Sequence, residues 1–228
     1  MVTLRGLSSM ATRGVLTALT AEGDLGLGHL EVESAGGVEV ARRLRAGGQA
    51  DVVVLASDAI EALARDGVLD GQTVLPLLRS DVVVGVPQGA PVPDISSVES
   101  LTAALLASRR IGYSTGPSGS ALQALVGAWG LDEQLADRWV QAPPGVPVAR
   151  LLADGAADLG FQQRSELAAA PGVTVAGRMP PGAEIITIFT GAVATASEHP
   201  AEALAVLTLL AAPAAHGVIR RHALEPAT

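Results

Sequence analysis

The sequence contains no cysteine and no lysine, and only 2% of its 228 residues are aromatic. Without cysteine the chain can form no disulfide, no thiolate nucleophile and no cysteine-ligated metal site. All 15 residues of the lysine and arginine class are arginine, which excludes Schiff-base chemistry and the lysine of a P-loop. The scarcity of aromatic side chains argues against a surface that stacks nucleic-acid bases. Hydroxyl groups, amides, backbone N–H groups and arginine remain as candidate functional groups.

The overall charge and hydropathy define the class of protein. Hydrophobic residues make up 49% of the chain and charged residues 17%, which is typical of packed cores and not of disorder. The net charge of −8 argues against nucleic acid as a partner. The four histidines do not recur at a metal-binding spacing, so we expect no metal ion and no cofactor. No stretch is long and apolar enough for membrane insertion, and no leader is recognisable; we expect a cytoplasmic protein, or a periplasmic one whose signal peptide has been removed.

One phrase occurs twice in the chain and indicates the architecture. Residues 44–54 and residues 151–161 both read as the end of a helix, a glycine turn, an Ala-Asp pair and a short apolar strand. With the alternation of strands and helices elsewhere, this predicts an α/β protein of two Rossmann-like lobes with mostly parallel sheets. Pro/Gly-rich bends place lobe 1 at residues 1–80 and 185–228 and lobe 2 at residues 81–184, joined by a two-strand hinge. Because such sheets bind ligands beyond the carboxyl ends of their strands, we expect a ligand cleft between the lobes.

Three loops rich in serine and glycine, at residues 8–9, 34–37 and 116–120, are predicted to lie between a strand and the helix that follows it. A helix N-terminus offers unpaired N–H groups to an anion, and small residues let that anion approach the backbone. Serine and glycine are also ordinary residues of caps and turns, so this alternative stays open. The candidate ligand-binding residues in these loops are Ser8, Ser9, Gly36, Gly37, Ser118, Gly119 and Ser120.

Two adjacent amides, Gln162 and Gln163, end an otherwise apolar predicted strand. Their side chains can donate to a carboxylate or an oxyanion at the mouth of a lobe. The alternative is that one amide satisfies loop backbone and the other is exposed. Arg5, Arg13 and Arg150 are predicted to lie nearest the cleft, and Arg13 is the best placed of them to anchor a carboxylate. For each of the three, an ordinary surface position is the favoured alternative.

Several strings, taken in their order, resemble the periplasmic molybdate-binding protein family, which has a type II periplasmic-binding fold. They are V-A-R-R-L-R-A-G-G-Q-A-D-V-V-V at 40–54, G-P-S-G at 116–119 and G-x-A-D-L-G-F at 155–161. The resemblance implies that a tetrahedral oxyanion is held by hydroxyls and backbone amides of both lobes. By position, it implies a ligand serine at Ser9 or Ser8, an amide donor at Ser118, and a further backbone donor near Gly145 or Val146. The family's second ligand serine falls on Gly37 and its ligand tyrosine on Gln163, so two hydroxyl contacts to molybdate are missing.

The strings Y-S-x-G-P-S-G, A-P-P-G-x-P-V-A and G-F-Q-Q-x-S-E-L are similar to a divergent branch of this family, which also resembles aconitate isomerase. The resemblance implies a small-anion binding protein, for an oxyanion or a carboxylate, like the substrate-binding component of a molybdate ABC transporter. If the protein is exported, a transporter permease is an expected partner. The alternative is a cytosolic isomerase that moves a double bond in a small polycarboxylate. The sequence shows no pair of acid and base residues, so no catalytic residue is assigned.

Overall fold

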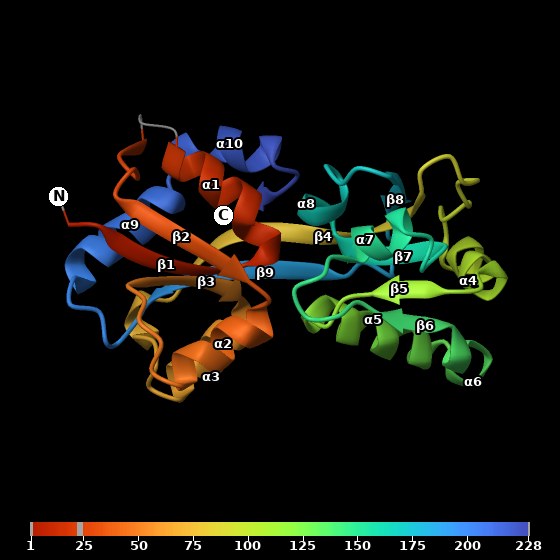
Figure 1. Cartoon of the computed structure of the whole chain (residues 1–228), viewed down its shortest axis with the longest axis horizontal. Helices are drawn as coiled ribbons and strands as arrows, with labels where there is room; N and C mark the ends of the chain where they lie inside the picture. Colours follow the sequence, from red (N-terminus) through yellow and green to blue (C-terminus); the bar gives the residue numbers. More distant parts are fainter. Residues whose placement is uncertain (1, 22–24, 228) are drawn as a thin grey trace. The chain divides into compact units, whose positions relative to one another are not determined.

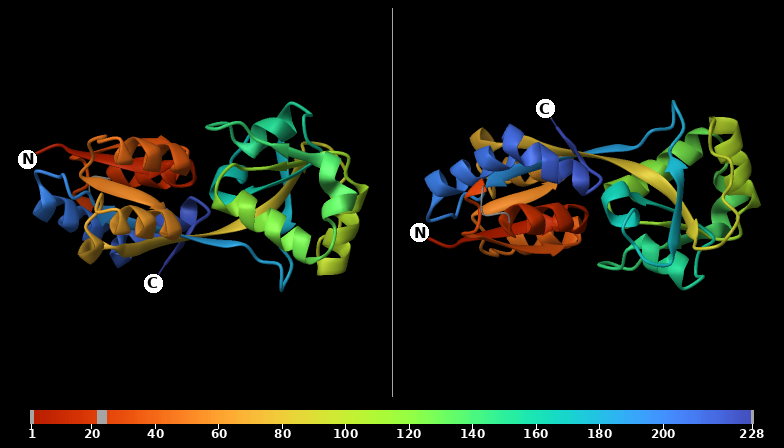
Figure 2. Two further views of the ribbon diagram at one scale, coloured as in Figure 1. Left: turned by 90° about the horizontal axis from the view of Figure 1, so that it is seen from below. Right: turned by 90° about the horizontal axis from the view of Figure 1, so that it is seen from above.

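The computed structural model describes residues 2–21 and 25–227, which form two units. Unit 1 comprises Met1–Ser80 and Thr187–Thr228, and unit 2 comprises Asp81–Ile186. The chain passes from one unit to the other within strand β4, Leu75–Pro87, and returns at the start of strand β9, Ile186–Val193. These two strands are neighbours in the sheet (Figure 2).

The sheet of unit 1 has the strand order β2-β1-β3-β9-β4, with β10 paired to β4. Strand β1 is parallel to both β2 and β3, whereas β9 runs antiparallel to β3. Besides β4 and β9, the strands are β1 (Leu4–Ser9), β2 (Leu30–Ala35), β3 (Val52–Ala56) and β10 (Glu225–Pro226).

Helices cover both faces of this sheet, which explains the continuous apolar run of β3. Val52 and Val54 pack in one core cluster with the apolar residues of α1, α9 and α10, and Val53 and Leu55 pack in another with those of α2 and α3 (Figure 1). Alternate residues of a strand point to opposite faces, so both halves of the run are buried. The helices are α1 (Arg13–Ala21), α2 (Gly37–Arg45), α3 (Ser57–Arg65), α9 (Pro200–Leu210) and α10 (His216–Arg221), with short 3₁₀ helices at Met10–Thr12, Gly71–Thr73 and Pro213–Ala215.

Unit 2 repeats this plan with the strand order β4-β7-β5-β6, and β8 also pairs with β4. Strand β5 is parallel to β6 and β7, and β4 is antiparallel to β7 and β8. The strands are β5 (Ile111–Tyr113), β6 (Trp139–Gln141), β7 (Leu159–Gln163) and β8 (Val173–Arg178). The helices are α4 (Val98–Ala107), α5 (Pro117–Ala128), α6 (Asp132–Leu135), α7 (Val148–Ala153) and α8 (Arg164–Leu167), with a 3₁₀ helix at Ala136–Arg138.

The predicted α/β class is confirmed, and the sheets are more mixed than expected. A parallel group of three strands lies in each unit, and the long strands β4 and β9 add antiparallel pairs. The strand β8 was not predicted, although its V-T-V-A sequence alternates as a half-buried strand does.

Three boundaries predicted for the serine-rich loops are wrong. Ser8 and Ser9 lie in strand β1 and Ser34 lies in β2, because the parallel pairing of these strands continues to the contact between Ser9 and Ala35. Helix α5 already begins at Pro117, so Ser118, Gly119 and Ser120 belong to its first turn. Proline is favoured at this first position because its missing N–H has no helical partner there.

Within the described residues, no single helix is long and apolar enough to cross a membrane. The segments Pro200–Leu210 and Pro213–Arg221 pass that test together by length and composition, with a bend of 55° between them. Their apolar residues, such as Val206, Leu207 and Ile219, are buried in the core of unit 1.

Candidate functional site

The carboxyl edge of the parallel strands in unit 1 gathers the starts of several helices. Strands β1, β2 and β3 are neighbours with the same direction, and a 3₁₀ helix leading into α1, then α2 and α3, follow them directly. Among the described residues, no side chain caps the first turn of these helices, whose cap positions are Ser9, Gly36 and Ala56. Helix N-termini carry partial positive charge and outward-pointing N–H groups, so this edge is suited to an anion.

The start of α2 is the most open of these sites. Its first helical hydrogen bond runs from the Val40 N–H to the Gly36 carbonyl, so the N–H groups of Gly37, Val38 and Glu39 precede the helical ladder. Gly36 has an ordinary φ of −58°, so its backbone does not require glycine. A Cβ atom added to Gly36 would meet no atom within 4 Å, and one added to Gly37 would meet only the Leu55 side chain, at 3.8 Å. Glycine here leaves the backbone N–H groups accessible to a ligand.

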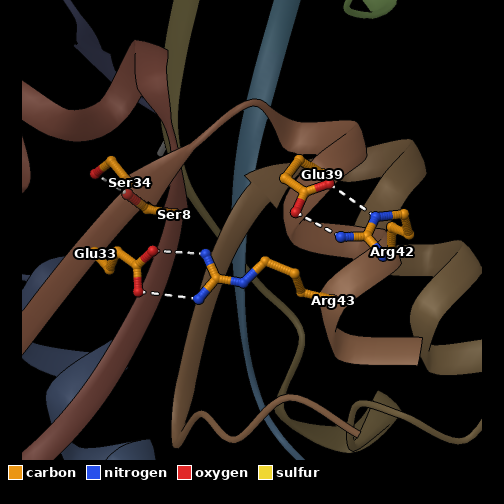
Figure 3. A network of polar contacts seen from close by, with 6 residues as sticks. All are labelled: Ser8, Glu33, Ser34, Glu39, Arg42 and Arg43. Atoms are coloured by element: carbon orange, nitrogen blue, oxygen red, sulfur yellow. Dashed lines mark hydrogen bonds and ion pairs between the residues drawn. The ribbon is translucent and has the colours of Figure 1, made fainter. Parts of the chain in front are cut away.

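Buried and half-buried hydroxyl groups line the same edge. The Ser8 and Ser34 hydroxyls lie 2.7 Å apart, joining β1 to β2 (Figure 3). The Ser57 hydroxyl donates to the Ile188 carbonyl and lies 2.6 Å from the Thr190 hydroxyl, so Thr190 is the donor in that pair. The row of hydroxyls therefore continues across β3 to β9.

Ser9 differs from these paired hydroxyls. Among the described residues, the one hydrogen-bond partner of its hydroxyl is the Thr12 hydroxyl, at a long 3.4 Å, while Thr12 donates its own proton to the Ser9 carbonyl at 3.0 Å. A separation of 3.4 Å is a weak hydrogen bond. Of the two serines predicted at this position, Ser9 is therefore better able to donate to a ligand than Ser8.

The charged side chains of α2 are neutralised in pairs rather than directed at this edge. Arg43 binds both carboxylate oxygens of Glu33, at 2.6 and 3.0 Å, and Arg42 binds both of Glu39, at 2.8 Å each (Figure 3). The hydrogen bonds from Arg43 hold the pKa of Glu33 below its ordinary value, and those from Arg42 do the same for Glu39. Arg42 is exposed and Arg43 is half-buried, so both ion pairs lie at the surface of the unit. Arg13, the arginine that the sequence favours as an anchor, is exposed at the first position of α1.

The corresponding edge of unit 2 begins with the loop from β5 to α5. The Ser114 and Ser118 hydroxyls lie 3.1 Å apart, and no side chain of the described chain caps α5. The N–H groups of Gly119 and Ser120 already donate to the Gly116 carbonyl, and Pro117 has none. The remaining first-turn donor is the N–H of Ser118, the residue that the resemblance selects as an amide donor.

Gly119 has a packing role of its own. A Cβ atom at this position would collide with the backbone carbonyl of Ser114, so the close approach of the loop to the helix requires glycine. Ser120, the next residue of this turn, is exposed. Of the two further backbone donors implied by the resemblance, the N–H of Val146 donates to the Pro143 carbonyl within a turn, and Gly145 adopts a positive φ of 78° in that turn.

The two glutamines at the end of β7 are both buried, with 2% and 5% of their surface exposed. The Gln162 Oε1 atom accepts the Ala149 N–H at 3.1 Å and thereby binds the start of α7. Its amide group donates to the Glu166 carboxyl, in the first turn of α8. Gln162 therefore satisfies a backbone N–H of α7 and at the same time orients a carboxyl group. The alternative of one exposed amide is wrong, because Gln163 is buried as well.

Among the described residues, Glu166 has the most strongly shifted carboxyl pKa, and it was not among the residues predicted from the sequence. Burial raises its pKa from an ordinary 4.5 to about 7, and the hydrogen bond from Gln162 only partly opposes this. A carboxyl group with such a pKa can both accept and donate a proton near neutral pH. The G-F-Q-Q-x-S-E-L string, in which Glu166 follows four residues after Gln162 at the end of a predicted strand, was the available signal.

Residues 8–225 match the family model for bacterial extracellular solute-binding proteins. The chain belongs to this family. The chain is 34% identical over 188 residues to an aconitate isomerase from Pseudomonas sp, covering 82% of this chain and 71% of the isomerase.

Solved structures of solute-binding proteins share the fold. The periplasmic molybdate-binding protein of Azotobacter vinelandii superposes with a TM-score of 0.79 at 19% identity, over 97% of this chain and 98% of that one. The substrate-binding domain of a molybdenum ABC transporter from Clostridium difficile gives 0.75 at 16% identity over the whole of both chains. The sulfate-binding protein SubI of Mycobacterium tuberculosis gives 0.75 at 19% identity, over 100% of this chain and 88% of that one. The type II periplasmic-binding fold inferred from the sequence motifs is therefore confirmed.

Among the described residues, no three histidine or acidic side chains lie close enough together to hold a metal ion. The ligand cleft and the assignment of ligand-binding residues stay predictions. The structure does identify which of the candidates have hydrogen-bonding capacity to offer, namely Ser9, Gly36, Gly37 and Ser118.

Proposed function

We propose that this protein binds a small anion, an oxyanion or a carboxylate, through backbone N–H and hydroxyl groups at the carboxyl edges of its sheets. The observation that carries the proposal is the convergence of three helix starts without side-chain caps on one edge of unit 1. Ser9 supplies a hydroxyl there, and the N–H of Ser118 serves the same purpose in unit 2. The names of the structural relatives, which bind molybdate and sulfate, support an anion as the ligand class.

The first experiment measures thermal stabilisation and calorimetric binding with molybdate, tungstate, sulfate, citrate, and cis- and trans-aconitate. A ligand that binds the native state raises its apparent stability in proportion to the logarithm of ligand excess. We expect saturable stabilisation by at least one of these anions. If none of them stabilises the protein at millimolar concentration, the proposal is wrong.

Substitution of Gly36 by aspartate tests the location of the site. The new carboxylate can accept from the free N–H groups of α2, which stabilises the helix by a few tenths of a kcal/mol, and it occupies the position of an anionic ligand. We expect unchanged or higher thermal stability together with at least a tenfold loss of affinity. The matched control is Gly28→Asp, which adds the same charge to an exposed turn at the other end of β2, where a Cβ atom would come only within 3.9 Å of the Thr20 carbonyl. Equal loss of affinity in both variants would refute this location.

An isomerase is the second candidate function, and the identity of 34% to an aconitate isomerase favours it. The same N–H and hydroxyl groups would then hold the carboxylates of a small polycarboxylate while a double bond moves. Conversion of cis-aconitate to trans-aconitate, followed by chromatography, distinguishes the two functions. Binding of aconitate without turnover supports a solute-binding protein, and turnover supports the enzyme.

The two functions also differ in their expected partners and location. A solute-binding protein for uptake, in agreement with the extracellular description of the family, would deliver its anion to a transporter permease in the periplasm. A catabolic isomerase would work in the cytoplasm. Cell fractionation with an antibody to the chain separates these locations.

A further inference from the structure

Glu166 is an unusual group to find beside donors that suit an anion. It lies in the first turn of α8, directly after the carboxyl end of β7. Strand β7 pairs in parallel with β5, whose carboxyl end leads to the Ser118 turn, so both ends lie on one edge of unit 2. A permanently ionised carboxylate at that edge would repel a polycarboxylate ligand. A carboxyl group that gains and loses a proton near neutral pH can instead act there as both an acid and a base.

The surroundings of Glu166 hold it in one orientation. Gln162 is buried, and its Oε1 atom is engaged by the Ala149 N–H. The amide NH2 group of Gln162 is therefore directed away from α7 and towards the Glu166 carboxyl. Glu166 as a whole residue is half-buried, so part of it remains accessible.

Within the described chain, burial and the Gln162 amide are the two influences on the pKa of Glu166, and no charged partner contributes. Burial favours the neutral acid and raises the pKa to about 7, while the Gln162 amide stabilises the carboxylate. Arg150, on the adjacent helix α7, is exposed and binds Asp154 at 2.6 Å. The group is thus poised between its two protonation states, the condition for efficient proton transfer at neutral pH.

We propose that Glu166 is the acid–base residue that transfers a proton between the two ends of an allylic system in a bound unsaturated polycarboxylate. The proposal rests on the proposed anion site and develops its isomerase alternative.

In the first step the Glu166 carboxylate removes a proton from the CH2 carbon next to the double bond. The C–H electron pair becomes part of an allylic anion, whose charge spreads onto the neighbouring ligand carboxylates and is stabilised by N–H donors. In the second step the Glu166 carboxylic acid returns a proton to the other end of the allylic system, and the double bond completes its shift. No electron leaves the ligand, and no further reactant is needed.

This chemistry predicts exchange of ligand hydrogen with solvent. In D2O the removed proton equilibrates with deuterium before it is returned, so the CH2 and vinyl signals of trans-aconitate should disappear from the proton NMR spectrum. The experiment uses the full chain with trans-aconitate, and calorimetry on the same samples measures binding. We expect Glu166→Gln to retain binding within about threefold and to lower the exchange rate by about 100-fold or more, the usual contribution of a general acid–base residue.

Two further variants separate catalysis from structure. Glu133→Gln removes an exposed carboxylate from α6 of the same unit and should leave exchange unchanged. Glu166→Ala should lose exchange and recover part of it when formate is added, because a small carboxylate can replace the missing base. A merely structural role for Glu166 would show no such rescue, which also keeps the proposal testable if the glutamine variant is poorly folded.

The outcomes distinguish this proposal from the proposed function. Binding of trans-aconitate without exchange by the unmodified protein would overturn the role of Glu166 and leave anion binding intact. Exchange that persists in Glu166→Gln would overturn the role and leave the isomerase function intact. Absence of binding by every polycarboxylate tested would overturn the polycarboxylate site and the acid–base role together.

Discussion

Replacement of Glu166 by glutamine should remove a pH-dependent loss of stability. In the unfolded chain the carboxyl group ionises at its ordinary pKa of 4.5, whereas in the folded protein burial raises the pKa to about 7. Below about pH 4.5 the carboxyl group is protonated in both the folded and the unfolded state, and the protein has its full stability. Between 4.5 and 7 the unfolded state ionises first and is favoured, so the free energy of unfolding falls as the pH rises.

The size of this effect follows from the shift. One pKa unit corresponds to about 1.4 kcal/mol, so the step from 4.5 to about 7 corresponds to about 3 kcal/mol. Part of Glu166 reaches solvent, which makes this value an upper bound. Glutamine has the shape of glutamate and no ionisation, so the variant should match the unmodified protein at about pH 4 and exceed its stability by up to about 3 kcal/mol at about pH 8.

Urea denaturation from about pH 4 to about pH 9 measures the difference between the two proteins directly. The exposed Glu133→Gln serves as the control, since any change common to both variants reports net charge alone. The reasoning is refuted if the stability difference between the unmodified protein and Glu166→Gln stays constant across this range.

Four further substitutions test other parts of the structure. Gly119→Ala should lower the free energy of unfolding by about 2 kcal/mol or more, because the new Cβ atom collides with a backbone carbonyl. Gly36→Ala, with open space around the new Cβ atom, should change the free energy of unfolding by less than about 0.5 kcal/mol. Urea denaturation of both variants measures the difference. Ser57→Ala leaves the buried Thr190 hydroxyl without its acceptor and should cost about 1–3 kcal/mol, whereas an equal stability of the two proteins would contradict the pairing. Arg43→Ala breaks only an exposed ion pair, so thermal unfolding should show no measurable loss, at low or high salt.

Local sequence patterns predicted most of the secondary structure. The apolar run at residues 52–55 is a central strand, and the helix at Pro200–Leu210 begins at the proline that marks its first turn. Both signals depend on the residues of the segment itself. The predicted ends of β1 and β2 came too early because serine has little intrinsic preference for strands. The pairing of β1 with β2 extends β1 to Ser9, and a local pattern does not contain that pairing.

The candidate site was less accessible to sequence reasoning. The contact between Ser57 and Thr190 joins residues 133 positions apart, and a local pattern cannot predict such a pair. The serine and glycine loops were recognised because helix starts have a local signature. The proton affinity of Glu166 depends on burial by surrounding elements, which only the folded structure determines.

The division of the chain between the units affects its synthesis. Unit 2 is continuous and has all of its strands once Ile186 has emerged from the ribosome, whereas unit 1 still lacks β9, α9 and α10. Val15 and Leu16 of α1 share a core cluster with Leu207 and Ile219, which are translated about 200 residues later. Because domains fold as units during translation, the part of the protein made first completes its core last. A nascent or C-terminally truncated chain therefore presents the apolar faces of unit 1 to chaperones and proteases while unit 2 is already able to fold.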